Sequence, residues 1–199
     1  MKMNLPNLLS LARIVIAPVF FFFFISGDPL FVMLSFYLFM LGATSDYLDG
    51  WFARKFNAAT RWGRIFDPIA DKVLTSFAFL AFVFMDIVPL WMVLIIILRD
   101  FGTTIMREFG EKFKVPMATS KSAKLKTFLQ MAFISLILIL VYITNSGFFK
   151  SYHLQITSFI NSEAVYYTML ALTILTLWTL IEYILKNKRL IRTLLSKAA

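Results

Sequence analysis

The sequence predicts an all-α, polytopic membrane protein with six transmembrane helices and a short N-terminal interfacial helix, built as a single domain over residues 1–199. Three observations support this fold class. Hydrophobic residues make up 60% of the chain and the mean hydropathy is +0.79, whereas soluble domains contain roughly 45–50% apolar residues. Apolar stretches recur six times, each near the length of about 20 residues that a helix needs to cross a bilayer. The basic residues gather in alternate connections between those stretches.

The first element is expected at the N-terminus, where residues 4–13 alternate polar and apolar and predict a short helix lying in the membrane interface. The first apolar stretch contains Arg13 and no small-residue cleavage site follows it, so we expect a retained helix and not a signal peptide. The six spans are predicted near 8–26, 29–48, 69–86, 88–107, 124–145 and 163–186. The turn Gly27-Asp28-Pro29, the pair Val88-Pro89 and the polar segment 144–163 separate some of them.

The distribution of charge predicts the orientation of these spans. With six spans both chain ends share one side of the membrane, and every Lys and Arg except Lys150 falls on that side. An excess of Lys and Arg in short loops marks the cytoplasmic face. This topology also explains the formal charge of +9 without any nucleic-acid partner. The chain has no cysteine, which excludes disulfide and thiolate chemistry.

The spans 29–48, 69–86 and 88–107 differ from the others because each continues into charged sequence without a helix breaker at the border. We expect these three helices to extend beyond the membrane on the cytoplasmic side. Charge at membrane depth is expensive and is tolerated mainly toward water-accessible interiors. Their polar halves are therefore predicted to line a cavity that is open to water.

Four of the 11 acidic residues, namely Asp46, Asp49, Asp67 and Asp71, lie close together between the second and third spans. At 100° per residue, Asp46 and Asp49 share one helical face, and Asp67 and Asp71 share a face of the next helix. Four carboxylates that close would repel unless cations compensated them. An all-oxygen set without His or Cys favours Mg²⁺, Mn²⁺ or Ca²⁺ over zinc. Two such ions about 3.5–4 Å apart would suit phosphoryl transfer.

Small residues occur on the same two faces, at Gly50 and Ala53 on the first helix and at Gly63 on the second. Such residues allow a ligand to approach the helix closely, and they also allow membrane helices to pack tightly. Both explanations remain open from the residues alone.

The complete pattern, Asp46-x2-Asp49-Gly50-x2-Ala53-Arg54-x8-Gly63-x3-Asp67-x3-Asp71, resembles the signature of the CDP-alcohol phosphatidyltransferases. The resemblance implies a six-span enzyme in which a CDP-linked lipid donates its phosphatidyl group to an alcohol and CMP leaves. It implies two divalent cations, Mg²⁺ or Mn²⁺, held by Asp46, Asp49, Asp67 and Asp71. It implies that Asp71 is the base that deprotonates the acceptor hydroxyl, and that homodimers are common. The implied CDP-binding residues are Asp49, Gly50, Ala53, Arg54 and Gly63.

Three further stretches resemble the phosphatidylglycerophosphate synthases of bacteria, a branch of this family. They are NLPNLLSLARI (4–14), DPIADK (67–72), and LRD (98–100) and MRE (106–108) together with SKSAKLKT (120–127). This resemblance implies that CDP-diacylglycerol reacts with sn-glycerol 3-phosphate in the bacterial inner membrane, during phospholipid biosynthesis. An anionic acceptor needs cations, and arginine suits phosphate through its bidentate fork. We predict that the acceptor phosphate binds Arg99, Arg107, Ser120, Lys124 and Lys126.

Other functions remain open from the sequence. The same chemistry could use inositol phosphate, serine or phosphatidylglycerol as the acceptor. A divalent-cation transporter is a different class, but the carboxylates cluster at one interface and none lies at mid-membrane within a span. A catalytically silent subunit is a third class, against which the complete aspartate set argues.

Overall fold

The computed structural model describes residues 5–56, 61–112, 120–147 and 149–188, and within these ranges the side chains of 5–7, 46–56, 61–67, 112 and 150 are not described. Its helices are α1 (Leu5–Phe24), α2 (Pro29–Phe56), α3 (Arg61–Phe84), α4 (Leu90–Lys112), α5 (Lys121–Asn145), the 3-10 turn η1 (Lys150–Tyr152), α6 (His153–Ile160) and α7 (Glu163–Lys186). No strand occurs among the described residues. The all-α prediction is therefore confirmed.

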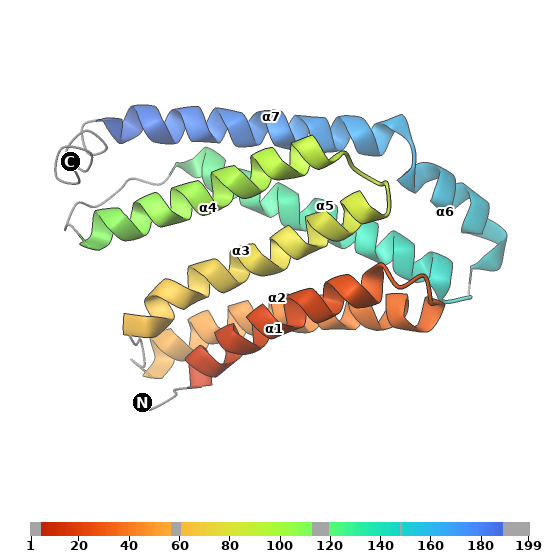
Figure 1. Cartoon of the computed structure of the whole chain (residues 1–199), viewed down its shortest axis with the longest axis horizontal. Helices are drawn as coiled ribbons and strands as arrows, with labels where there is room; N and C mark the ends of the chain where they lie inside the picture. Colours follow the sequence, from red (N-terminus) through yellow and green to blue (C-terminus); the bar gives the residue numbers. More distant parts are fainter. Residues whose placement is uncertain (1–4, 57–60, 113–119, 148, 189–199) are drawn as a thin grey trace.

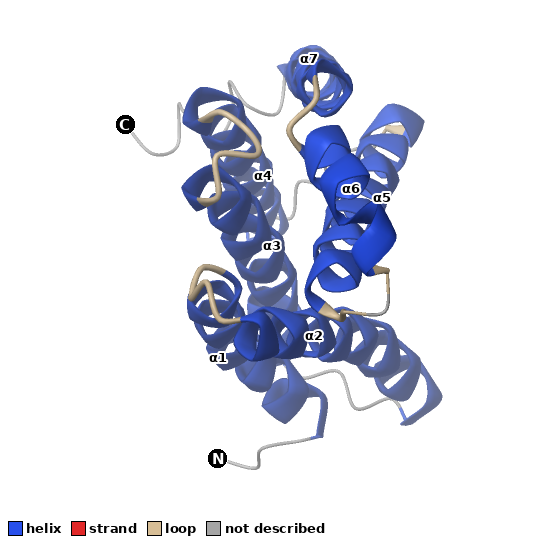
Figure 2. Ribbon diagram, turned by 90° about the vertical axis from the view of Figure 1, so that its right-hand side faces the viewer, coloured by secondary structure: helices blue, strands red, loops and turns tan. Residues whose placement is uncertain are grey.

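The six long helices run roughly along the length of the molecule (Figure 1). Figure 2 shows α1 and α2 at one edge and α7 at the opposite edge, with α3, α4 and α5 between them. The last turns of α2, α4 and α7 lie at the same end as the first turns of α1 and α3. The charged sequence of several helices is thereby gathered at one end of the bundle.

By length and composition, the stretches Lys121–Asn145 and His153–Lys186 are each sufficient to cross a membrane, and Leu8–Phe24 and Pro29–Ser45 form shorter apolar helices. The three helices continue into the charged sequence, as predicted, while their extension beyond the membrane on the cytoplasmic side stays a prediction. Helix α2 continues to Phe56 and α4 to Lys112, while α3 already begins at Arg61. Helix α3 includes Pro68 and continues beyond it.

Two predictions about helix boundaries are wrong. The expected interfacial helix at 4–13 is not a separate element, because α1 is continuous from Leu5 to Phe24. Arg13 interrupts the apolar pattern for a different reason: it is completely buried, and its Nε donates to Gly42 O of α2 at 3.1 Å. The segment 144–163, expected to be only a polar connection, contains α6, whose last residue Ile160 is buried in the core.

The core that positions these helices is rich in phenylalanine. Phe20 of α1 and Phe39 of α2 are fully buried, with ring centroids 5.5 Å apart. Phe79 of α3 stacks on Phe133 of α5 at 6.4 Å. Gly42 allows α2 to approach α3 closely, since a Cβ added there would lie 2.8 Å from a methyl carbon of Leu74. These contacts fix the backbones on which the charged end is built.

Candidate active site

The backbone places the aspartate pattern on two consecutive helices. Asp46 and Asp49 lie in the last part of α2, and Asp67 and Asp71 lie in the first half of α3. The end of α2 and the start of α3 lie at the same end of the bundle (Figure 1). The side chains of Asp46, Asp49 and Asp67 lie outside the described residues, as do those of Gly50, Ala53, Arg54 and Gly63. Their predicted roles in metal and CDP binding remain predictions.

Asp71 is the one predicted metal ligand whose side chain is described. Its carboxylate is about one-third exposed, and its Oδ2 lies 2.8 Å from Lys72 Nζ. Among the residues with described side chains, no three His, Cys, Asp or Glu groups converge. The donor chemistry fits Mg²⁺ or Mn²⁺, because the four aspartates offer only oxygen and Asp71 is accessible from solvent.

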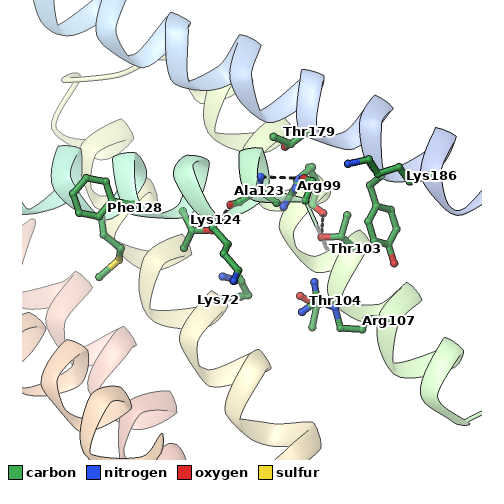
Figure 3. A pocket seen from close by; sticks show the side chains of 14 residues that line it. Lys72, Arg99, Thr103, Thr104, Arg107, Ala123, Lys124, Phe128, Thr179 and Lys186 are labelled. Atoms are coloured by element: carbon green, nitrogen blue, oxygen red, sulfur yellow. Dashed lines mark hydrogen bonds between the residues drawn. The ribbon is translucent and has the colours of Figure 1, made fainter. Parts of the chain in front are cut away.

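A cavity of about 610 Å³ opens between α3, α4, α5 and α7, and Lys72, which contacts Asp71, is one of its lining residues (Figure 3). Basic side chains from all four helices line it, and no Asp or Glu is among the described lining residues. Hydroxyl groups of Ser, Thr and Tyr residues also line it. The cavity is lined by Lys72, Arg99, Thr103, Thr104, Arg107, Ser120, Ala123, Lys124, Thr127, Phe128, Met131, Thr179, Tyr183 and Lys186. Cations and hydroxyl donors in one concave space suit an anionic, phosphate-bearing molecule.

The structure brings four of the five residues predicted to bind the acceptor phosphate into this one cavity, namely Arg99, Arg107, Ser120 and Lys124. Lys126 lies elsewhere. Its side chain is 1% exposed and its Nζ donates to Asp100 Oδ1 behind the cavity wall. Lys126 is therefore placed to support the wall and is not among the residues that line the cavity.

One carboxylate oxygen of Asp100 accepts hydrogen bonds from two cationic side chains. Arg99 Nη1 donates to Asp100 Oδ1 at 3.1 Å, and Lys126 Nζ donates to the same atom. The exposed fractions of the Arg99 and Asp100 side chains are 9% and 7%. Two cations thus share one carboxylate, which leaves the cluster with a net positive charge beside the cavity. Arg99 Nε is buried and has no hydrogen-bond partner among the described residues.

The first turn of α5 forms another part of the cavity wall. Ser120 caps this helix, and its Oγ accepts a hydrogen bond from Ala123 N at 3.2 Å. A helix N-terminus carries partial positive charge and presents backbone N–H groups, so this turn adds to the positive potential of the cavity. On the other side, Lys186 Nζ of α7 lies 2.6 Å from Glu182 Oε1, and Ser122 of α5 also donates to Glu182.

Sequence reasoning missed several residues of the cavity. Thr103 lies midway between Arg99 and Arg107 in a spacing of i, i+4 and i+8, so its place on the same face could have been read from the sequence. Lys72 adjoins Asp71 and could have been proposed from that position. The contribution of Lys186 depends on the packing of α7 against α4 and α5, for which the sequence contains no signal.

Comparison with known proteins adds a family and a set of relatives. The family model described as CDP-alcohol phosphatidyltransferase matches residues 3–179. A CDP-diacylglycerol–glycerol-3-phosphate 3-phosphatidyltransferase of Bacillus subtilis (strain 168) is 30% identical over 202 residues, covering 96% of this chain and 98% of that protein. A protein of the same name from Rickettsia typhi is 40% identical over 136 residues, covering 68% of this chain and 76% of that protein.

Proposed function

The chain belongs to the CDP-alcohol phosphatidyltransferase family, and from this premise we propose that it transfers the phosphatidyl group of CDP-diacylglycerol to sn-glycerol 3-phosphate. The products are phosphatidylglycerophosphate and CMP. The observation that carries the choice of acceptor is the cavity that five basic residues line from four helices, one of which, Lys72, contacts Asp71. The names of the relatives support the same acceptor.

The charges of the cavity discriminate between the acceptors. Glycerol 3-phosphate and inositol phosphate both bring a phosphate that Arg99, Arg107 and Lys124 can bind. Serine brings an ammonium group, which the five basic side chains would repel and which no Asp or Glu among the described lining residues would compensate. A phosphorylated acceptor is therefore favoured over serine, and the relatives favour glycerol 3-phosphate among the phosphorylated ones.

The proposed reaction begins with the acceptor phosphate bound among the cavity cations and its hydroxyl directed toward Asp71. Asp71 accepts the hydroxyl proton as that oxygen forms a bond to the phosphatidyl phosphorus, and the bond from phosphorus to the CMP oxygen breaks. Asp46, Asp49, Asp67 and Asp71 would hold two divalent cations, Mg²⁺ or Mn²⁺. When bound, these ions neutralise the pyrophosphate and stabilise the leaving CMP. Lys72 contacts Asp71 and also lines the cavity.

The same proposal includes a membrane arrangement. Helices α1 to α5 and α7 form six spans in the inner membrane of a bacterium, with the charged end on the cytoplasmic side and the single domain assembled as a homodimer. The apolar stretches and the bacterial relatives support the membrane, and the Lys and Arg distribution supports the orientation. Such a placement lets a lipid donor and a water-soluble acceptor meet at the interface.

The test is an acceptor panel. Purified protein in mixed micelles receives CDP-diacylglycerol, Mg²⁺ and either glycerol 3-phosphate, inositol phosphate, serine or phosphatidylglycerol, and the lipid product is identified by mass spectrometry. We expect phosphatidylglycerophosphate and one CMP for each molecule formed. Product only from another acceptor would overturn the acceptor assignment. Metal flux into liposomes without CMP release would favour the transporter.

A further inference from the structure

Asp100 is a buried carboxylate that the proposed transfer does not use. It lies on α4 and is 5% exposed, and one of its oxygens accepts hydrogen bonds from Arg99 on the same helix and from Lys126 on α5. Asp100 does not line the cavity, whereas Arg99 does. Asp100 therefore connects Arg99, which lines the cavity from α4, to the buried Lys126 of α5.

Stability of the fold is a weak explanation for this cluster. Buried ion clusters cost so much desolvation that well-packed apolar residues of similar volume often stabilise a protein equally or better. Specific positioning is a better-supported use of such groups. In this protein two cations surround one carboxylate, so an unbalanced positive charge remains where the acceptor phosphate is proposed to bind.

The group that Asp100 would position is the guanidinium of Arg99. The guanidinium has a planar fork that binds phosphate through two parallel N–H groups. Asp100 contacts Nη1, so the edge formed by Nε and Nη2 is the edge that Asp100 does not use. Nε is buried and unpaired among the described residues, a state that is costly unless a ligand satisfies it. Figure 3 shows Arg99 in the cavity wall next to Ala123, in the first turn of α5.

We propose that Asp100 is a positioning residue for acceptor binding, which holds the Arg99 guanidinium so that its Nε edge meets the phosphate of the acceptor. This inference rests on the proposed function. Lys126 is the second anchor, because it donates to the same oxygen of Asp100 and links α4 to α5.

The experiment compares steady-state kinetics of the wild type with Asp100→Asn and Asp100→Glu. For Asp100→Asn we expect the KM for glycerol 3-phosphate to rise at least tenfold, while kcat and the KM for CDP-diacylglycerol change by less than threefold. Asp100→Glu keeps the carboxylate and should recover most of the affinity. A purely structural role would instead lower the active fraction, and so kcat, without a selective change in the acceptor KM.

A double-mutant cycle tests whether Asp100 acts through Arg99. On an Arg99→Gln background, Asp100→Asn should raise the acceptor KM by less than threefold. Full additivity of the two effects would overturn the proposal, as would an unchanged acceptor KM in Asp100→Asn. If Asp100→Asn does not fold, Asp100→Asn with Lys126→Met removes the uncompensated cation as well, and the same rise in acceptor KM is expected.

Calorimetric titration with glycerol 3-phosphate and with inorganic phosphate separates this inference from the proposed function. A wild type that binds phosphate but makes no phosphatidylglycerophosphate would refute the proposed function only, and weaker binding by Asp100→Asn would still support positioning. Equal phosphate binding by both proteins, or none by the wild type, would refute the positioning role.

Discussion

Replacing Arg99 by Gln tests the cavity directly, because Arg99 lines the cavity, is nearly buried, and has an Nε without a partner among the described residues. The substitution removes the guanidinium and leaves Asp100 with Lys126 as a balanced pair. The fold should therefore persist, and the loss should be confined to the acceptor.

The expected rise in the acceptor KM can be estimated from the hydrogen bonds that the guanidinium would lose. Hydrogen bonds to charged groups are worth about 1.5–3 kcal/mol, and about 1.4 kcal/mol corresponds to a tenfold change in affinity. The KM for glycerol 3-phosphate should accordingly rise by roughly 10- to 150-fold. The KM for CDP-diacylglycerol should stay within about threefold, because the donor is proposed to bind at the aspartate end.

Lys186→Gln is the matched control, since it also removes one positive charge from the same cavity. Lys186 is 51% exposed and is already paired with Glu182 at 2.6 Å. Solvent screens the charge of an exposed, paired lysine, so the acceptor KM should change far less than in Arg99→Gln. The assay is CMP release at varied glycerol 3-phosphate and saturating CDP-diacylglycerol. Equal effects of the two substitutions would show that only overall charge matters, and an unchanged KM in Arg99→Gln would refute the assigned contact.

Three further outcomes are expected. Asp71→Asn should reduce kcat to a few per cent or less while the protein keeps its thermal stability, and substantial residual turnover would remove Asp71 from the base role. Chelation with EDTA should abolish CMP release, and added Mg²⁺ or Mn²⁺ should restore it; turnover that survives chelation would contradict the metal assignment. Among the described residues, nothing lies within 4 Å of a Cβ added at Gly102, so Gly102→Ala should stabilise α4 by about 0.5–1 kcal/mol. Gly42→Ala should instead be less stable than Gly102→Ala by about 1–3 kcal/mol, since its Cβ would lie 2.8 Å from Leu74. Thermal unfolding in detergent compares the two glycine variants, and equal stability would contradict the close approach of α2 and α3.

Helix positions followed from the sequence because long apolar stretches and charged borders are strong local signals. Part of the cavity could also be predicted from the sequence, since Arg99 and Arg107 are eight residues apart on one helix and share a face. Lys124 and Lys126 could not both face the cavity, because residues two apart point about 200° apart on a helix. Helical geometry alone would therefore have separated them, and the structure places Lys126 against Asp100.

Other features depend on contacts between distant segments. Arg13 looks in the sequence like a polar interruption near a membrane surface, yet it is fully buried between α1 and α2, where it bonds to Gly42. Lys186 looks like one of several tail charges that set topology, yet it lines the cavity from α7. In both cases the surroundings of the side chain depend on how the helices pack, which no local sequence pattern predicts.

The most direct test of the account is an experimental structure of the protein with Mn²⁺ and glycerol 3-phosphate bound, with the ions located by anomalous scattering. The account predicts Mn²⁺ among Asp46, Asp49, Asp67 and Asp71, with the acceptor phosphate within hydrogen-bond distance of Arg99 Nε and the acceptor hydroxyl facing Asp71. Aspartate side chains that diverge without Mn²⁺ between them, or a phosphate bound outside the cavity, would contradict it.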